Sequence, residues 1–335
     1  MSLRLSLIAV ALGSAALPAF ADEVNIYSHR QPELIQPLLD AFTAETGIAV
    51  NIAFVDKGMA ERLVAEGDRS PADLVLTVDI ARLIEVVQAG VTQPVDSAVL
   101  TANIPAEFRD PGNQWFGLTT RARIVYASKD RVQPGAVTTY EDLADPKWKG
   151  KICMRSGTND YNVALTAAVL AHHDAAFTSA WLEGVKANLA RKPNGGDRDQ
   201  VKAIWAGECD ISIGNTYYYG QMINDPEQAE WANAVRLDFP VFEGAGTHMN
   251  ISGIAMTKSA PNHDAALKLM EWLASDAAQK IYSETNYEFP VEPGVERSEL
   301  VKSWGDFTPD SLSLAEVAAK RPEALKLIET VDFDN

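Results

Sequence analysis

The chain has 335 residues with a formal net charge of −17 at pH 7, and 47% of its residues are hydrophobic. This length leaves room for about two domains of ordinary size. The strong negative charge disfavours nucleic acid and anionic lipid as partners, because both would be repelled, and it is compatible with a cationic ligand.

The first 21 residues, MSLRLSLIAVALGSAALPAFA, have the features of a secretory signal. Arg4 is followed by an apolar run that ends at Leu12, and the terminal AFA fits the small-residue rule for signal peptidase. The alternative is a membrane anchor, which needs roughly 20 apolar residues, whereas this run is short and is broken by Gly13 and Pro18. We therefore expect cleavage after Ala21 and export.

Short strands and helices alternate along the rest of the chain, which predicts an α/β fold with a mostly parallel sheet and helices on its faces. In the first helical run, apolar residues from Leu34 to Phe42 share one face and the helix is expected to end at Gly47. Pro37 weakens this prediction unless it lies within the first turns. Near the C-terminus, Pro322 is expected to divide the stretch 314–330 into two short helices. Strands are expected at 24–27, 50–54, 74–77, 124–127, 210–213, 235–239 and 250–257, and helices at 59–66, 81–89, 163–171, 176–189, 197–205, 263–273 and 277–284.

The sequence contains two cysteines, Cys153 in KGKICMRSG and Cys209 in AGECDISIGN. Both segments are typical of a strand with the cysteine near its start. If the two strands are neighbours in one sheet, a disulfide is geometrically possible and would suit an exported protein. The alternative is a pair of buried thiols, and the sequence leaves both open. Two cysteines, and five histidines without HExxH spacing, fall short of a zinc site.

The sequence motifs of common enzyme classes are absent: there is no GxSxG elbow, no SxxK, no GxxxxGK phosphate loop and no GxGxxG after the first strand. The one histidine cluster, His172-His173, falls at the end of a predicted helix. A positive charge suits the helix dipole there, so we interpret the pair as a solvated helix end rather than a metal site. An exported enzyme with a tyrosine or carboxylate in a cleft is therefore the least favoured function.

Three of the nine tyrosines are consecutive in GNTYYYGQ (214–221), just after a predicted strand and just before a helix-like run. Adjacent phenols at such a turn often serve packing, since one ring can face the core while another faces the surface. However, Asn215 and Thr216 precede them at the carboxyl end of the strand, which is the edge where open α/β sheets bind ligands. This segment alone is compatible with packing and with ligand binding.

Seven segments together carry a resemblance to a known family: NIYSHRQ, RSPADLVLTVD, LTTRARIVYASKD, DLADPKWKGKICMRSGTNDYN, NGGDRDQ, AGECDISIGNTYYYGQ and GTHMNISGIAMTKSAPN. The chain resembles the periplasmic ferric-ion-binding proteins, which are the substrate-binding components of iron ABC importers. Their fold is the transferrin-like, two-lobed (type II) solute-binding fold. The similarity covers essentially the whole mature chain, and the NxYY and SGxxxYN motifs are specific when they occur together.

The resemblance implies a set of ferric ligands. The two ligand tyrosines of NxYY fall on Tyr217 and Tyr218, which leaves Tyr219 for packing, and a third ligand tyrosine falls on Tyr161. The arginine that neutralises charge or holds a synergistic anion such as carbonate falls on Arg121. Phenolate is a hard anionic oxygen donor and suits a hard, highly charged ferric ion. Further contacts to the anion or the ligands are expected from Ser156, Thr158 and Asn215.

The sequence departs from the family near the first strand. Some members carry a histidine shortly after that strand and a glutamate in the second crossover, and these positions hold Gln31 and Val78 here. Neither side chain is a good ferric ligand. We therefore expect the N-terminal lobe to supply only Tyr27 or His29, or nothing, with an anion or water completing the ligand shell.

The resemblance also implies discontinuous lobes, 22–120 with 248–296 and 121–247 with 297–335. Segments near Thr120-Arg121 and Thr247-His248 would form the hinge, with Arg121 at the cleft floor. The implied partners are ferric ion and the inner-membrane permease of an iron ABC importer, and we expect a monomer without catalytic activity. The alternative that keeps the fold is a different ligand: an organic cation, an oxyanion or a ferric chelate.

Overall fold

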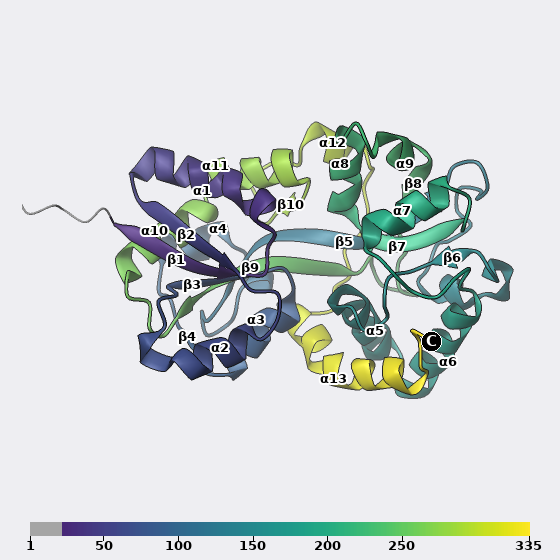
Figure 1. Cartoon of the computed structure of the whole chain (residues 1–335), viewed down its shortest axis with the longest axis horizontal. Helices are drawn as coiled ribbons and strands as arrows, with labels where there is room; N and C mark the ends of the chain where they lie inside the picture. Colours follow the sequence, from purple (N-terminus) through teal and green to yellow (C-terminus); the bar gives the residue numbers. More distant parts are fainter. Residues whose placement is uncertain (1–21) are drawn as a thin grey trace, which may run out of the picture.

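The computed structural model of the chain describes residues 22–335, so the predicted signal sequence and its cleavage site lie outside the described part. Two lobes lie side by side and are joined by two strands, β5 (Phe116–Ser128) and β9 (Met249–Thr257) (Figure 1). The first half of β5 pairs with β9, and its second half pairs with β7 (Ile211–Asn215). The predicted two-lobed α/β fold is confirmed. Among the described residues, no helix is both long and apolar enough to span a membrane.

The first lobe is a sheet with helices on both faces, and its strands run in the order β2-β1-β3-β9-β5. β3 is buried along its whole length because alternate side chains face opposite helix layers. Leu74 packs with Phe42 and Leu269 on one face, whereas Val75 packs with Leu83 on the other. The elements are β1 (Glu23–Ser28), α1 (Pro32–Thr46), β2 (Ala49–Phe54), α2 (Met59–Glu66), β3 (Leu74–Thr77), α3 (Ile80–Gln88), β4 (Thr92–Gln93), α4 (Ala98–Asn103), α10 (His263–Leu273), α11 (Asp276–Ile281) and β10 (Phe289–Pro290).

The second lobe is built in the same way around the second half of β5. β5 pairs with β7 and β8, and β7 pairs with β6. Val125 and Ile213 pack with α5 and α6 on one face, while Ile124 packs with α7, α8 and α9 on the other. The elements are β6 (Ile152–Cys153), α5 (Asp160–His172), α6 (Ala175–Ala187), α7 (Asp197–Trp205), α8 (Thr216–Asn224), α9 (Ala229–Asn233) and β8 (Val235–Asp238).

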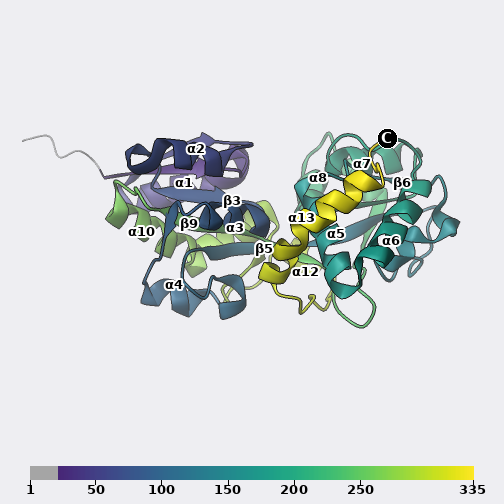
Figure 2. The ribbon, with the colours of Figure 1, turned by 90° about the horizontal axis from the view of Figure 1, so that it is seen from below.

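The C-terminal segment connects the two lobes a further time. After β10 and the short helix α12 (Glu299–Lys302), the chain ends in α13 (Leu314–Thr330). α13 lies obliquely across the second lobe, packs on α5 and α6, and reaches α3 of the first lobe with its N-terminal end (Figure 2).

The prediction for Pro322 is corrected by the structure. α13 runs unbroken through Pro322, so the expected division into two short helices is wrong. A capping box between Ser313 and Glu316 starts this helix, and burial of Ile328 against the second lobe offsets the hydrogen bond that proline cannot donate. α1 ends at Thr46 with Gly47 as its C-cap, so the helix predicted before Gly47 is confirmed. It continues through Pro37, which lies in its second turn, and buries most of its apolar face.

The prediction of a mostly parallel sheet is wrong. Within residues 22–335, parallel pairing joins β1 to β2, β1 to β3 and β6 to β7, whereas β5 and β9 run antiparallel to their main-sheet neighbours. The physical reason is connectivity: β5 leaves the first lobe and β9 returns to it, so the two strands run in opposite directions. Strand patterns in the sequence do not reveal this.

Most predicted element positions are confirmed, with α2, α7 and α10 found at their expected bounds. Two elements extend further than expected. The strand predicted at 124–127 is only the end of β5, and the helix predicted at 277–284 is α11 followed by a π-helical turn at Tyr282–Asn286.

The structure decides the state of the two cysteines. Cys153 and Cys209 form a disulfide with their Cα atoms 5.8 Å apart. Cys153 ends β6 and Cys209 lies two residues before β7, and these strands are parallel neighbours. The disulfide therefore fixes β6 against the strand that leads into α8.

Candidate metal centre

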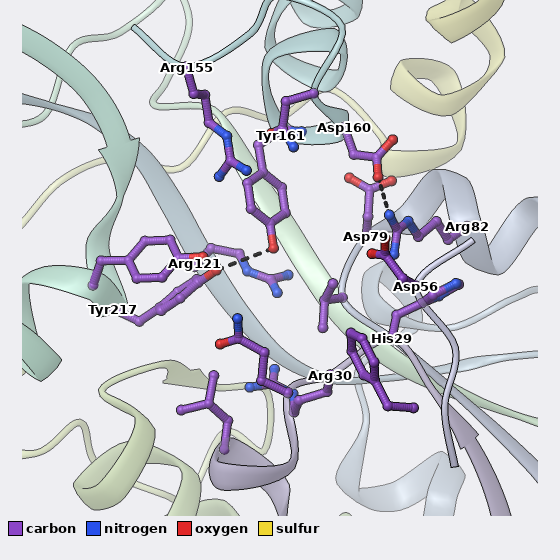
Figure 3. A pocket seen from close by; sticks show the side chains of 16 residues that line it. His29, Arg30, Asp56, Asp79, Arg82, Arg121, Arg155, Asp160, Tyr161 and Tyr217 are labelled. Carbon is purple, nitrogen blue, oxygen red and sulfur yellow. Dashed lines mark hydrogen bonds and ion pairs between the residues drawn. The ribbon is translucent and has the colours of Figure 1, made fainter. Parts of the chain in front are cut away.

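A polar cavity of about 180 Å³ lies between the two lobes (Figure 3). The second lobe contributes three phenols to its wall, those of Tyr161, Tyr217 and Tyr218. The Tyr217 hydroxyl donates a hydrogen bond to the Tyr161 hydroxyl at 3.3 Å, and the ring centroids of Tyr217 and Tyr218 are 4.3 Å apart. The structure thus brings together the three tyrosines that the resemblance indicates as ligands.

The tyrosine triplet divides between the cavity and a packing contact outside it. β7 leads directly into α8, so the first turn of this helix carries Tyr217 and Tyr218, and both line the cavity. Tyr219 does not line it and instead meets Trp304 edge to face, with ring centroids 6.0 Å apart. This placement agrees with the predicted packing role of Tyr219.

Packing requires the two glycines that flank the tyrosines. A Cβ atom at Gly214 would lie 2.2 Å from the ring of Tyr126, and one at Gly220 would lie 2.3 Å from the ring of Tyr287. The Tyr126 hydroxyl donates a hydrogen bond to the carbonyl oxygen of Asn215 at 2.5 Å. Glycine at both positions therefore lets aromatic rings support the turn that presents the phenols.

The third phenol comes from a second helix N-terminus. α5 begins at Asp160, and the Asn159 side chain caps it by accepting a hydrogen bond from the Tyr161 amide at 3.1 Å. Asn162 donates to the carbonyl oxygens of Arg155 and Ser156, which holds the preceding loop against the helix. Because the first turn of a helix carries partial positive charge, both helices favour phenolate anions in the cavity.

Arg121 lies on β5 at the cavity wall and is 1% exposed. Its Nη2 donates to Ser252 Oγ at 2.7 Å and lies 3.5 Å from Glu288 Oε1. Its guanidinium carbon is 5.8 Å from the centroid of the Tyr217 ring. Nε and Nη1 have no hydrogen-bond partner among residues 22–335. Two buried donors are thus free to bind an anion beside the phenols, as the resemblance implies.

A buried network that the sequence analysis missed supports the phenols. Asp197 is ion-paired with Arg123 at 2.6 Å and with Arg155 at 3.2 Å. The guanidinium carbons of these arginines lie 5.7 Å and 5.4 Å from the centroid of the Tyr161 ring, and Arg155 also lines the cavity. Asp197 lies in NGGDRDQ and Arg155 directly precedes the SGTNDYN motif. Both residues lie in or beside segments that carry the family resemblance, and this position could have pointed to them in the sequence analysis.

Asn215 connects this network to the ligand set. Its Oδ1 accepts a hydrogen bond from Arg123 at 3.1 Å, and its Nδ2 lies 3.3 Å from the Tyr217 hydroxyl and donates to it. Asn215 is 2% exposed and does not line the cavity itself. The structure therefore places it as an orienting contact for Tyr217.

The phenols are protonated when no cation is bound. Burial raises the pKa of Tyr161, Tyr217 and Tyr218 above the ordinary value of 10.0, and the neighbouring phenols raise it further. The positive charge of Arg121 lowers the pKa of Tyr161 and Tyr217 but does not outweigh burial. A highly charged cation is needed to displace these protons.

The structure does not direct Ser156 and Thr158 into the cavity. Ser156 Oγ donates to Asp334 and lies 2.8 Å from Thr158 Oγ1. Thr158 is exposed, and neither residue lines the cavity. The expectation that they contact the anion is corrected: Asp334, near the C-terminus, occupies the Ser156 hydroxyl and the Gly157 amide.

Tyr27 also points away from the cavity. Its hydroxyl donates to Glu66 at 2.9 Å, and Arg62 covers its ring with the guanidinium carbon 4.1 Å from the centroid. Tyr27 packs in the layer formed by α2 and α3. The sequence places it correctly at a strand end, but the side chain faces α2, so it leaves the candidate ligand set.

The first lobe closes the other side of the cavity with a mixture of polar and apolar side chains. Gln31 and Val78, at the positions where the resemblance expects a histidine and a glutamate, both line it. His29 lines it as well, and burial and the positive charge of Arg82 hold its pKa down to about 3. Its Nδ1 is buried without a hydrogen-bond partner among the described residues. The imidazole is thus neutral and faces the phenols across the cleft.

The histidine pair at the end of α5 differs from the solvated helix end that the sequence predicts. His172 lies 2.7 Å from Asp310, and His173 lies 2.7 Å from Glu141. Both rings are only about one-fifth exposed. Across residues 22–335, histidine, cysteine, aspartate and glutamate side chains form no group of three or more that could hold a metal ion.

The fold and the cavity define a class of protein: two lobes joined by strands, with a polar binding site enclosed between them, as in receptors that close around a solute. The chain belongs to the bacterial extracellular solute-binding protein family, whose model matches residues 27–280.

Relatives within this family are named for iron. Iron uptake protein A1 of Synechocystis sp. is 42% identical, over 94% of this chain and 88% of the relative. The structure of apo ferric ion-binding protein A of Pasteurella haemolytica is 54% identical, covers 94% of this chain and 99% of its own, and has a TM-score of 0.91. A Trichodesmium protein solved in complex with iron and citrate is 42% identical, covers 93% and 99%, and has a TM-score of 0.86. The resemblance found in the sequence motifs is confirmed.

Proposed function

We propose that this chain is the periplasmic receptor of an iron ABC importer, which binds ferric ion in the cavity between its lobes and delivers it to an inner-membrane permease. One observation carries the proposal: the phenols of Tyr161, Tyr217 and Tyr218 converge on one cavity beside Arg121, which has two free buried donors. The iron-related names of similar proteins support the same ligand.

The charges of this set suit ferric ion. Three phenolates balance its three positive charges, and Arg121 offsets one added anion. Ionising a free phenol at pH 7 costs about 4 kcal/mol, and burial increases this cost here. A ferric ion supplies far more electrostatic stabilisation than a monovalent organic cation, and it prefers hard oxygen donors. The phenol cluster therefore favours ferric ion over an organic cation.

The synergistic anion is proposed to bind at Arg121 Nε and Nη1, next to Tyr217. Carbonate would fit there, and a larger oxygen chelator such as citrate is also compatible with a cavity of about 180 Å³. The Trichodesmium relative was solved with iron and citrate. Both candidates share carboxylate-type oxygens, which accept charge-assisted hydrogen bonds from a guanidinium.

The lobe boundaries remain as proposed from the sequence: 22–120 with 248–296, and 121–247 with 297–335. The continuous run of β5 through both sheets supports a hinge near Thr120-Arg121. The hydrogen bond from Arg123 N to His248 O supports the second crossing beside it. Binding would start on the second lobe, which holds the phenols, and closure of the first lobe would then exclude water.

The remaining parts of the proposal concern the cell. We propose that residues 1–21 are a secretory signal cleaved after Ala21 and that the mature protein acts in the periplasm as a monomer without catalytic activity. The Cys153–Cys209 disulfide supports an oxidising compartment.

The experiment that tests this function is visible spectroscopy of the purified mature protein with ferric salt. Phenolate-to-iron charge transfer is expected to give an orange to red band, and a colourless mixture without bound metal would overturn the proposal.

Arg121→Ala is expected to weaken iron binding more with carbonate present than without it. Equal loss under both conditions would remove the anion-binding role of Arg121.

A further inference from the structure

The two lobes touch at an ion-pair cluster beside the phenols. Arg82 of α3 in the first lobe is ion-paired through Nη2 with Asp160 Oδ2, and Asp160 is the first residue of α5 in the second lobe (Figure 3). Arg321 of α13 is ion-paired with the other carboxylate oxygen, Oδ1, and donates to the Asp160 carbonyl oxygen at 3.3 Å. Both oxygens of this one carboxylate therefore have a guanidinium partner.

The cluster includes a second carboxylate from the first lobe. Arg321 Nη1 lies 3.9 Å from Oδ1 of Asp79. Asp79 is fully buried, caps α3 by accepting from the Ala81 amide at 2.8 Å, and accepts from Asn250 Nδ2 at 2.6 Å. Asp79 is thus fixed to α3 and β9, and Arg321 faces acids of both lobes at once.

The same residues form part of the cavity wall. Asp79, Arg82 and Asp160 line the cavity, and Tyr161 is the next residue after Asp160. The lobes cannot separate around the phenols without breaking the contact between Arg82 and Asp160. Its side chains are 20% and 23% exposed, so solvent screens it less than a fully exposed pair.

We propose that Arg82, Asp160 and Arg321 form an interlobe latch that slows the release of bound iron by holding the cleft closed next to Tyr161. The effect of the latch on iron release rests on the proposed function. Its effect on lobe closure is argued from the interlobe contacts alone. Arg82 and Arg321 act through lobe position and do not contact the iron. α13, which packs on α3 and α5, carries the second arginine to the same carboxylate.

Release kinetics test the latch. The iron-loaded mature protein is mixed with excess EDTA, and the loss of the charge-transfer band is followed in time. Arg82→Gln is expected to release iron about tenfold faster, which corresponds to about 1.4 kcal/mol, with the band position unchanged because the phenolates are intact. Arg321→Gln, which leaves Arg82 in place, is expected to have a smaller effect of about threefold.

Two controls separate the latch from a general effect of losing an arginine. Arg62→Gln removes an arginine of the same lobe whose ion pair with Glu66 stays within that lobe, and it is expected to leave release unchanged. In an Asp160→Asn background, Arg82→Gln is expected to add no further acceleration. An equal effect of Arg82→Gln with and without Asp160 would overturn the proposal.

Small-angle scattering of the iron-free protein tests closure without iron. Arg82→Gln is expected to increase the radius of gyration, whereas Arg62→Gln is not. An unchanged radius together with unchanged release would overturn the latch. If the unsubstituted protein binds no iron, the proposed function fails, and the scattering comparison still decides whether the latch exists.

Discussion

The second lobe carries three phenols into the cavity on the first turns of α5 and α8, whereas the first lobe offers neutral or charged polar groups such as His29, Gln31 and Arg82. Beneath the phenols, the second lobe also holds the buried Asp197 network. In the first lobe, the tyrosine that the sequence offered as a candidate ligand, Tyr27, is turned toward Glu66.

This difference indicates a division of labour. A lobe that holds all three phenols can bind a ferric ion before closure, and a lobe without them can move without losing ligands. The contacts between the lobes then control how long the ion stays. The following predictions test this division in order of expected effect.

The largest effect is expected from removing a phenol of the second lobe. Tyr161→Phe, Tyr217→Phe or Tyr218→Phe should lower ferric affinity roughly a thousandfold or more, since a charged ligand is lost, and should shift the charge-transfer band. Competition with a chelator of known affinity measures this. Tyr219→Phe is the matched control and should change affinity little. If Tyr219→Phe proved as damaging as Tyr217→Phe, the assignment within the triplet would be wrong.

The next largest effect concerns the disulfide, which belongs to the second lobe. Replacing Cys153 and Cys209 by serine should lower the free energy of unfolding of that lobe by about 4 kcal/mol, because the disulfide closes a loop with a sequence separation of 56 residues. Urea unfolding of the iron-free protein measures this loss. A variant as stable as the parent would show that β6, β7 and the phenol-bearing α8 do not depend on the disulfide.

The third prediction concerns pH. Burial raises the pKa of the phenols, so they carry protons when iron is absent and release them when it binds. Affinity should therefore fall as pH falls, by about tenfold per unit for each phenol that releases a proton. Chelator competition between about pH 8 and about pH 6 measures the slope, and Tyr217→Phe should make it shallower by one proton. A slope near zero would contradict phenolate ligation.

The smallest effect is expected in the first lobe. Tyr27→Phe should change ferric affinity by less than about threefold, because its hydroxyl bonds Glu66 and not the cavity. The lost hydrogen bond should lower the free energy of unfolding by about 1 kcal/mol. Thermal unfolding and chelator competition separate the two effects. A large loss of iron affinity would show that the first lobe supplies a phenol after all.

The sequence predicted residues on both sides of the cavity, since His29, Gln31 and Val78 of the first lobe also line it. Tyr161, Tyr217, Tyr218 and Arg121 were assigned from motifs, and the structure brings them to one cavity. The placement of these side chains at the cavity was predictable where a local motif determines the backbone, as at the β7–α8 turn. The prediction failed for Tyr27, because a strand end determines the position of a side chain but not the neighbour that it meets.

The prediction that Ser156 and Thr158 contact the anion failed for a related reason. They lie in the correct loop, but Asp334 reaches that loop from the other end of the chain. The latch shows the same limit, since Arg82, Asp160 and Arg321 are far apart in sequence and meet only through the packing of α13 on both lobes.

The sequence by itself determined the alternation of strands and helices and the place of Tyr217 and Tyr218 just after a strand. These features depend on residues close together in the chain, where local geometry and propensity decide. The tertiary structure alone decided the antiparallel course of β5 and β9, the unbroken α13, the disulfide and the orientation of Tyr27. Each of these depends on contacts between distant segments, whose burial and pairing outweigh local preference.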